Sequence, residues 1–488
     1  METNFQQKRD RIQMDEKSVI TNEKTNRRKF GLHLTSIDIF YRYIFPEIRN
    51  HLENFLWVDL YAGVGNLILP ILNEIPKDKR EAFFREQIYL FDVQKEMVKK
   101  CIENAGKYGI PEEIAEKNIK TRDNLKNFPQ ILNRQKIPIF HITNPPYLYL
   151  GYIRKHSETQ KYLSYFEHKN EGYQDLYQIA MMNDLHNELD NLIYVIPTNF
   201  LYGASVSNKF RLDFLKYYKI TKMVIFETSM FEYTGTNICI GFFKRKVISK
   251  DEPQSFEGLK IKNKNNFVIR DYYLKPKYKY RAGSEFDEFI EENHYERPLI
   301  VSYYLRKEEV DNNPGPVEID VIDANVYENN HYKKLKIGIS KKLKEKIENN
   351  ILYARTVDTG SVDGRAGLGI IREHFGVDGI YVSGNTYRTH PIQIFLKPEL
   401  TFEDQLLLRN YFNTILEYFR TKLDSEFLTT YKYSKAEYTR KFLGLTQVRG
   451  LIETFPHELN EENKEKLINF IKNNKIEKIF KSIQLFKS

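Results

Sequence analysis

The fold is indicated most clearly by residues 139–147, which read Ile-Phe-His-Ile-Thr-Asn-Pro-Pro-Tyr. The first five residues are rich in β-branched and aromatic side chains, which suits a strand that is covered on both faces of a parallel sheet. The two prolines then end the strand, because they lack N–H donors and fix φ, and they push Asn144 into an extended conformation. The sequence therefore predicts a stiff loop at the carboxyl end of a buried strand, where open α/β sheets bind their ligands.

The side chains of this loop suit a flat ring that carries an amino group. The carboxamide oxygen of Asn144 and the carbonyl of Pro145 are two acceptors for the two protons of an NH₂ group. The ring of Tyr147 offers a face for stacking. Two acceptors would favour the pyramidal form of an aromatic amine, whose lone pair can attack without a strong base. The alternative is a rigid proline turn after a core strand, because short motifs also match by chance.

Composition bounds the class of protein. The chain has 488 residues with 41% hydrophobic content, enough for two or three domains with a sizeable core. Its net charge of +9 favours a polyanionic partner, although evenly spread lysines would give the same total. Cys101 and Cys239 are the two cysteines, and they lack metal-ligand spacing. A disulfide framework and a cysteine-rich zinc site are therefore not expected, which fits a reducing cytoplasm.

The amino-terminal residues 1–28 are polar and charged and predict a mobile arm without a signal peptide. The sequence contains no run of about 18 apolar residues, so no membrane span is expected. These features together predict a cytoplasmic protein that does not contact a membrane.

A second informative stretch lies at residues 55–72. Residues 55–60 predict a strand, residues 61–66 (Tyr-Ala-Gly-Val-Gly-Asn) a turn, and residues 67–72 the start of a helix. Glycines let a ligand approach the backbone, and a helix N-terminus supplies N–H groups. The spacing is not that of a dinucleotide-binding fingerprint, and Asp59 suits an amino-bearing ligand better than a pyrophosphate. A plain strand-to-helix turn explains the pattern equally well.

Two more acidic residues follow predicted strands. Residues 87–92 predict a second strand that ends in Asp92, which is placed to bind ribose hydroxyls. The following helix would bury one face, formed by Met97, Val98, Cys101, Ile102 and Ala105. Asp123 follows a third predicted strand, and it would either accept a hydrogen bond from a nucleoside amino group or cap the next helix.

Further strands are predicted at residues 191–201, 222–227 and 236–244, with an aromatic loop at 230–235. Strands that alternate with helices and then close with a hairpin predict an α/β fold, a Rossmann-like, mostly parallel sheet with an antiparallel edge hairpin.

The composition changes after residue 245. Residues 246–265 are rich in Lys, Asn, Asp and Glu and predict a linker, and residues 266–488 predict a second domain of mixed α+β class. Residues 272–281 interleave basic and aromatic side chains, which indicates either a nucleic-acid surface or a solvated edge strand. The spacing of Leu408, Tyr411, Phe412, Ile415, Leu416 and Phe419 predicts an amphipathic helix.

Taken together, these motifs resemble those of the γ-class adenine-specific DNA methyltransferases of restriction–modification systems. Residues 29–36 resemble the family's amino-terminal cofactor motif, although its usual proline after threonine is Ser36 here. The resemblance covers about residues 28–245. It implies a catalytic domain at 29–245, a DNA target-recognition domain at 266–488, and S-adenosylmethionine binding by Thr35, Asp59, Tyr61, Ala62, Gly63, Gly65, Asn66, Asp92 and Asp123.

The resemblance also implies the reaction. A methyl group would pass from the sulfonium of S-adenosylmethionine to the 6-amino group of an adenine that has flipped out of duplex DNA. The catalytic residues implied are Asn144, Pro145, Pro146 and Tyr147, and no metal is needed. Tyr147 would stack on one face of the base, and Phe231 or Tyr233 on the other. We expect a monomer that binds double-stranded DNA, with a companion restriction endonuclease as a further partner.

Three other functions fit parts of the sequence. Enzymes that methylate the glutamine amide of release factors share the Asn-Pro-Pro-Tyr motif, but they lack a large carboxyl-terminal DNA reader. A ribosomal RNA adenine methyltransferase is compatible with the basic charge. A non-catalytic DNA-specificity subunit would not need Asn144 and Tyr147. A fused nuclease is not expected, because about 28 polar residues before the first motif are too few for a nuclease domain. The DNA sequence recognised does not follow from the residues.

Overall fold

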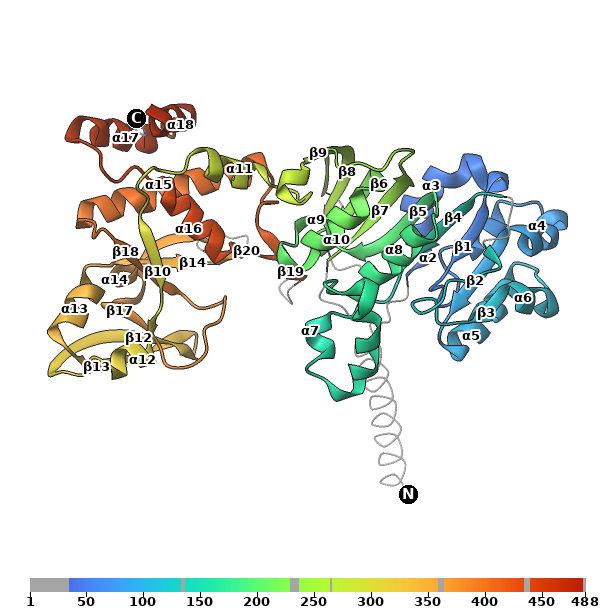
Figure 1. Ribbon diagram of the computed structural model, residues 1–488, viewed down its shortest axis with the longest axis horizontal. Coiled ribbons are helices and arrows are strands. Elements are labelled where there is room, and N and C mark those ends of the chain that lie inside the picture. Colours follow the sequence, from blue (N-terminus) through green and yellow to red (C-terminus); the bar gives the residue numbers. More distant parts are fainter. Residues whose placement is uncertain are drawn as a thin grey trace, which may run out of the picture. The chain divides into compact units, whose positions relative to one another are not determined.

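The computed structural model describes residues 35–132, 137–228, 237–263, 266–358, 364–433 and 439–485 (Figure 1). The chain divides into two compact units. The first contains Met1–Arg281 and Lys432–Glu437, and the second contains Ala282–Tyr431 and Tyr438–Ser488.

The first unit is built on a sheet of nine strands in the order β3-β2-β1-β4-β5-β7-β6-β8-β9. Their bounds are β1 Leu56–Asp59, β2 Ile88–Asp92, β3 Ile119–Thr121, β4 Ile139–Thr143, β5 Asn191–Pro197, β6 Tyr218–Phe226, β7 Ile238–Arg245, β8 Gln254–Asn263 and β9 Asn266–Leu274. Strands β3, β2, β1, β4 and β5 pair in parallel, whereas β7 is antiparallel to β5 and β6. The predicted mixed α/β class with a large, mostly parallel sheet is confirmed.

The central strands are buried because helices cover the sheet. All four residues of β1 are buried, and Trp57 of β1 stacks on Phe140 of β4 with ring centroids 5.2 Å apart. Since β1, β2 and β4 are parallel, their carboxyl ends meet at one edge of the sheet. Asp59, Asp92 and Asn144 therefore lie at the same edge.

The helices of the first unit connect these strands. They are α2 Ile37–Ile39, α3 Phe45–Ile48, α4 Arg80–Gln87, α5 Lys95–Lys107, α6 Glu112–Asn118, α7 Leu150–Ile153, α8 Leu176–His186, α9 Asn199–Tyr202 and α10 Ser205–Leu215. The predicted buried face of α5 is confirmed at Val98, Cys101 and Ala105. The α-helix predicted from residue 67 is wrong, because the glycine turn leads into a short 3₁₀ helix, η3 Leu69–Asn73, with Pro70 in its first turn.

Residues 246–265, which were predicted as a linker, contribute β8 to the first sheet. Phe256, Gly258 and Lys260 alternate with exposed residues along this strand, and the buried Lys260 ammonium lies 3.1 Å from the Glu227 carboxylate. The lysine-rich composition concealed this alternation. The antiparallel β6–β7 pair is confirmed, but β8 and β9 extend the sheet beyond it, so the edge hairpin is β8–β9.

The basic and aromatic residues 272–281 are divided between the interior and the surface, where Lys277 and Lys279 are exposed. Tyr272, Tyr280 and Arg281 are buried, while Tyr273 on β9 is half exposed. Because β9 is the last strand of the sheet, the edge-strand prediction is confirmed for residues 272–274, and the nucleic-acid surface stays a prediction.

The second unit mixes strands and helices. Two four-stranded sheets have the orders β10-β18-β14-β16 and β11-β17-β12-β13, and β15, β20 and β19 form a third. The strands are β10 Ile300–Tyr303, β11 Leu305–Arg306, β12 Val317–Glu328, β13 His331–Ile339, β14 Leu352–Arg355, β15 Val357–Asp358, β16 Gly367–Ile370, β17 Gly379–Val382, β18 Ile392–Lys397, β19 Thr429–Tyr433 and β20 Thr439–Phe442. The helices are α11 Glu285–Glu292, α12 Lys307–Asp311, α13 Lys341–Glu348, α14 Ile371–Phe375, α15 Phe402–Lys422, α16 Leu445–Glu453, α17 Glu461–Lys472 and α18 Ile476–Leu485.

Helix α15 organises the core of the second unit. Its predicted apolar face is confirmed, since the buried side chains are those of Leu408, Tyr411, Phe412, Ile415, Leu416 and Phe419. Within the described ranges, no helix is both long and apolar enough to span a bilayer.

Candidate cofactor and catalytic site

A pocket at the carboxyl edge of the first sheet brings together seven of the predicted site residues. Its walls come from the glycine turn after β1, the segment before α2 and the loop after β4. The lining residues are Thr35, Asp59, Tyr61, Ala62, Gly63, Val64, Asn66, Leu67 and Asn144. Six other described residues were predicted as site residues but lie outside this lining: Gly65, Asp92, Asp123, Pro145, Pro146 and Tyr147. Asn144 therefore lies beside the glycine turn, because the strands that precede them, β4 and β1, are parallel neighbours.

Asp59 is the most deeply buried acid of the pocket, with 1% of its surface exposed. Its Oδ1 accepts hydrogen bonds from the Thr143 hydroxyl, at 2.5 Å, and from the Tyr61 N–H, at 2.9 Å. Its Oδ2 has no partner among the described residues. Burial raises the pKa of Asp59 to about 7, against the opposing effects of His141 and these hydrogen bonds. Asp59 therefore changes charge near neutral pH and has one oxygen left for a cationic ligand group.

Asp92 fixes the turn that follows β1. Its Oδ2 accepts a hydrogen bond from the Gly63 N–H at 2.9 Å, and its Oδ1 accepts one from the Gln94 N–H at 2.8 Å. Burial also raises the pKa of Asp92. Each carboxylate oxygen has a second lone pair, so Asp92 can hold the turn and still accept hydrogen bonds from a ligand.

Gly65 cannot be replaced without strain. Its φ is +86°, and an added Cβ would lie 2.6 Å from Leu69 Cδ1 and 2.9 Å from Cys101 Sγ. Both neighbours are buried. The glycine is thus required for the turn conformation and for close packing against α5.

Thr35 connects the Asn-Pro-Pro-Tyr loop to the glycine turn. Its hydroxyl accepts a hydrogen bond from Asn144 Nδ2 at 2.9 Å, and its carbonyl accepts one from Asn66 Nδ2 at 2.8 Å. The Asn144 oxygen in turn accepts a hydrogen bond from the Tyr147 hydroxyl. The Asn144 carboxamide is therefore oriented from both ends.

Tyr147 is buried rather than open to solvent, with 9% of its surface exposed. Its hydroxyl contacts the Val195 carbonyl at 2.5 Å as well as Asn144, and its ring meets Tyr177 edge-on with centroids 6.5 Å apart. Burial raises the pKa of Tyr147, so the hydroxyl stays protonated. In this arrangement Tyr147 supports Asn144 through its hydroxyl.

Tyr61 contributes a polar atom that lacks a partner. Its hydroxyl is buried, and no described residue hydrogen-bonds to it. An unsatisfied buried hydroxyl costs free energy, so its position at the pocket marks a place where a ligand can form the missing bond.

Asp123 lies at the exit of β3 and is already engaged. Its Oδ2 accepts a hydrogen bond from the Tyr165 hydroxyl at 2.7 Å, and its Oδ1 accepts one from the Lys126 N–H at 3.3 Å. The second contact caps a turn at residues 124–126, where the sequence had left open the capping of a helix. Phe231, Tyr233 and the motif residues 29–34 lie outside the described residues.

A buried group of His141, Asp184 and Tyr194 near the Asn-Pro-Pro-Tyr loop escaped prediction. His141 Nδ1 lies 2.5 Å from Asp184 Oδ2, which also accepts a hydrogen bond from the Tyr194 hydroxyl at 2.6 Å. His141 Nε2 accepts a hydrogen bond from the Leu60 N–H at 3.2 Å, so its ring proton is on Nδ1. This buried group joins β4, which precedes Asn144, to the end of β1. The spacing of these residues along the sequence contains no signal for it.

Asp175 was also missed. Its carboxylate accepts a hydrogen bond from the Leu148 N–H at 2.9 Å, directly after the Asn-Pro-Pro-Tyr loop. Burial raises the pKa of Asp175 to about 7. An aspartate directly before the apolar helix α8 is an N-cap signal that could have indicated an ordered position.

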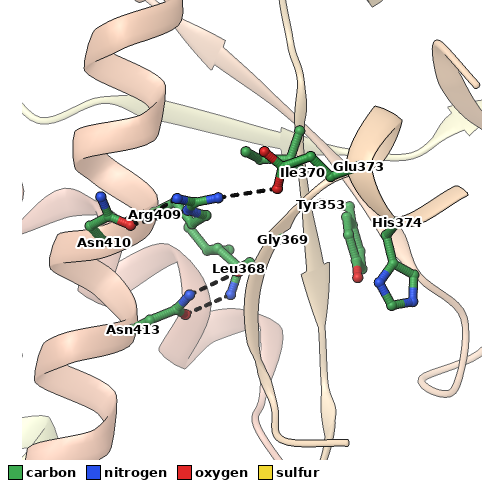
Figure 2. Close-up of a pocket in the computed structure, with 9 residues that line it drawn as sticks. All are labelled: Tyr353, Leu368, Gly369, Ile370, Glu373, His374, Arg409, Asn410 and Asn413. Atoms are coloured by element: carbon green, nitrogen blue, oxygen red, sulfur yellow. Dashed lines mark hydrogen bonds and ion pairs between the residues drawn. The ribbon is translucent and has the colours of Figure 1, made fainter. Parts of the chain in front are cut away.

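The second unit contains another pocket, of about 400 Å³ (Figure 2). It lies between α15, β16 and α14, and Figure 2 shows Arg409 reaching from α15 towards Glu373. The lining residues are Tyr353, Leu368, Gly369, Ile370, Glu373, His374, Arg409, Asn410 and Asn413. Over the described parts of the chain, no group of three or more His, Cys, Asp or Glu side chains could hold a metal ion.

The sequence matches one protein-family model. Residues 20–231 match the family described as Eco57I restriction-modification methylase. Among curated proteins, none matches the chain significantly.

Several solved structures resemble the chain at low identity. The restriction–modification enzyme MmeI in complex with DNA is 13% identical, with a TM-score of 0.48 over 94% of this chain and 76% of that one. A modification subunit of a type I restriction enzyme from Vibrio vulnificus YJ016 is 13% identical, with a TM-score of 0.36 over 69% and 58%. The DrdV–DNA complex is 12% identical, with a TM-score of 0.35 over 52% and 31%, so this chain spans less than a third of that one. The family match at residues 20–231 supports a methyltransferase of a restriction–modification system.

Proposed function

We propose that the protein is a site-specific DNA methyltransferase that uses S-adenosylmethionine to methylate the 6-amino group of adenine. The observation that carries this proposal is the hydrogen-bonded connection from Asn144 through Thr35 to Asn66. It joins an Asn-Pro-Pro-Tyr loop to a glycine turn in a single pocket. A plain proline turn after a core strand would need no such connection.

The pocket residues fit the chemical groups of S-adenosylmethionine. Asp59 Oδ2 would accept a hydrogen bond from the ammonium of the methionine moiety. The free lone pairs of Asp92 suit ribose hydroxyls, and the partnerless Tyr61 hydroxyl supplies a further polar contact. When bound, S-adenosylmethionine would supply an electrophilic methyl group on its sulfonium.

The catalytic loop would then act on the amino group of adenine. The Asn144 oxygen already accepts one hydrogen bond from Tyr147, and its second lone pair would accept one from the amine. The Pro145 carbonyl would accept the other amine proton, which favours the nucleophilic form of the nitrogen. Because Thr35 and Tyr147 hold the Asn144 amide in place, little reorganisation is needed in the transition state.

The target base must leave the duplex to reach this loop, which costs a few kcal/mol. In our proposal, Tyr147 and Phe231 or Tyr233 contact the flipped base. The second unit, Ala282–Tyr431 with Tyr438–Ser488, reads the flanking sequence. A companion endonuclease and a monomeric state belong to the same proposal.

Methyl transfer by the full chain tests the function. The protein is incubated with methyl-labelled S-adenosylmethionine and one of three acceptors: unmethylated plasmid DNA, ribosomal RNA or a release factor. We expect label in DNA with the parent chain and about 10²–10³-fold slower labelling with Asn144→Ala. Label that enters RNA or the release factor instead would assign the same catalytic loop to one of the other two acceptors, and the DNA proposal would be wrong.

A further inference from the structure

The pocket of the second unit is rich in hydrogen-bond donors (Figure 2). Arg409 is the main one, and its side chain is 26% exposed. Its Nε and Nη2 donate to Asn410 Oδ1 at 3.1 and 3.0 Å, and its Nη1 donates to Glu373 Oε2 at 3.4 Å. A guanidinium has five N–H groups, so two remain without an acceptor among the described residues.

Neighbouring side chains add further donors. His374 Nε2 faces Arg355 Nη2 at 3.1 Å and accepts its hydrogen bond, which places the ring proton on Nδ1. Neither this N–H nor the side-chain NH₂ of Asn410 has an acceptor in the part of the chain that the structure describes. Glu373 is the one carboxylate among the lining residues. Such an excess of donors favours an anionic ligand.

The existing partner of Arg409 is a weak competitor for such a ligand. Glu373 is 67% exposed, and its distance to Arg409 is at the long end for a hydrogen bond. Exposed ion pairs of this kind contribute little to stability. A phosphate can accept two parallel hydrogen bonds from one guanidinium, which makes it the stronger partner.

Aromatic rings line one side of the pocket and continue beyond it. The Tyr353 ring lies 5.8 Å from His374 and 5.1 Å from Phe375, measured between centroids. Phe375 lies 6.0 Å from Tyr332, which lies 4.8 Å from Tyr327. Tyr353 is buried, so the exposed rings are those of His374 in the pocket and Tyr327 beyond it. Rings beside cationic donors are the combination that nucleotides bind, with the phosphate on the cation and the sugar or base against the ring.

We propose that this pocket binds the phosphate of a nucleotide, with the DNA backbone as its source. The inference deepens the proposed function and rests on it, because it takes DNA to be the substrate. The Arg409 guanidinium and the Asn410 amide contact the phosphate oxygens, and Glu373 releases Arg409 when the phosphate enters. A free nucleotide has the same phosphate chemistry, so the experiment must separate the two sources.

Two substitutions with opposite expected effects test the pocket in the full chain. Binding of a fluorescein-labelled duplex is followed by anisotropy at several salt concentrations. Arg409→Gln should weaken binding about tenfold and lower the slope of log K against log salt by about one, as the loss of one phosphate contact requires. Glu373→Gln removes the competitor, so it should strengthen binding by about threefold.

Matched controls come from the exposed pair Arg297–Glu458, whose charges lie 2.9 Å apart on the same unit. Arg297→Gln and Glu458→Gln change the net charge equally, and both should leave binding within about twofold of the parent. A purely structural role for the pocket predicts instead that Arg409→Gln and Glu373→Gln weaken binding together, which would overturn the proposal.

Calorimetric titration with adenosine 5′-monophosphate forms the second arm. One outcome is that the parent chain binds this nucleotide, that Arg409→Gln does not bind it, and that the two proteins bind the duplex equally. The pocket is then a phosphate site whose ligand is a free nucleotide. If neither ligand depends on Arg409 more than on Arg297, the site does not exist. The binding assays need no methyl transfer. A parent chain that binds duplex through Arg409 but methylates nothing would therefore refute the proposed function alone.

Discussion

The affinity for S-adenosylmethionine should rise with pH up to about 7, because Asp59 must be ionised to hold the ammonium of the ligand. The pKa of Asp59 is about 7 in the folded protein, against 3.8 for an unburied carboxyl group. The ionised fraction is then about one hundredth at pH 5, one tenth at pH 6 and one half at pH 7. Since apparent affinity scales with the competent fraction, it should increase about tenfold from pH 5 to 6 and about fivefold from pH 6 to 7.

Calorimetric titration of S-adenosylmethionine between pH 5 and 7 measures this dependence, with Asp59→Asn as the comparison. The Asp59→Asn variant should bind S-adenosylmethionine weakly, and its affinity should no longer show the pH dependence that comes from Asp59. Asp92 is the second acid at this edge, and its pKa is also raised by burial. Titration of Asp92→Asn therefore shows how much of the remaining pH dependence of the affinity comes from Asp92. An affinity of the parent chain that stays flat from pH 5 to 7 would refute the role of Asp59.

The same raised pKa has a consequence for stability. Because the folded protein retains a proton on Asp59 that the unfolded chain loses above pH 3.8, the free energy of unfolding should fall as pH rises from about 4 to 7. The Asp59→Asn side chain carries no charge at any pH, so this variant should melt above the parent at pH 8. A lower melting temperature for the variant at pH 8 would show that burial of the charge is not costly here.

Four other substitutions probe the site. Asn144→Ala should leave S-adenosylmethionine binding near normal in calorimetry and cut methyl transfer about 10²–10³-fold, since it removes an acceptor for the amine protons; a rate close to the parent's would exclude a catalytic role. Asp92→Ala should weaken S-adenosylmethionine binding by about 1–3 kcal/mol, because it removes the acceptor for the ribose hydroxyls and for the Gly63 N–H of the glycine turn; an unchanged affinity would leave Asp92 a purely structural role. Gly65→Ala should lower the free energy of unfolding by about 1–3 kcal/mol in denaturant titrations, because a Cβ has no room there; wild-type stability would contradict the backbone assignment. His141→Ala should cost about 3–5 kcal/mol in the same assay, because the buried Asp184 carboxylate would lose the imidazole N–H and keep the Tyr194 hydroxyl as its donor; a smaller loss would mean that water replaces the ring.

The local sequence was sufficient to predict the position of candidate site residues that lie at the end of a strand. Asp59 and Asn144 each end a buried strand, so the parallel arrangement alone predicted that they share an edge. The outcome agrees, because both line the same pocket. The role of Asp123 stayed open in the sequence because one carboxylate can serve a ligand or a turn.

Features that depend on distant contacts could not be predicted. The His141–Asp184 pair joins residues 43 positions apart, and neither lies in a repeating pattern. Strand β8 was hidden because its inward-facing Lys260 is neutralised by Glu227, a pairing that composition does not reveal. The pocket around Arg409 combines residues from two strands and two helices, so no single stretch indicates it.

The central claim is that Asn144 directs methylation to adenine in DNA. The most direct measurement is mass spectrometry of nucleosides from plasmid DNA that has been incubated with the full chain and methyl-labelled S-adenosylmethionine. We predict labelled N6-methyladenine with the parent chain and about 10²–10³-fold slower labelling with Asn144→Ala. Label on cytosine, or equal labelling of adenine by the two proteins, would contradict the account.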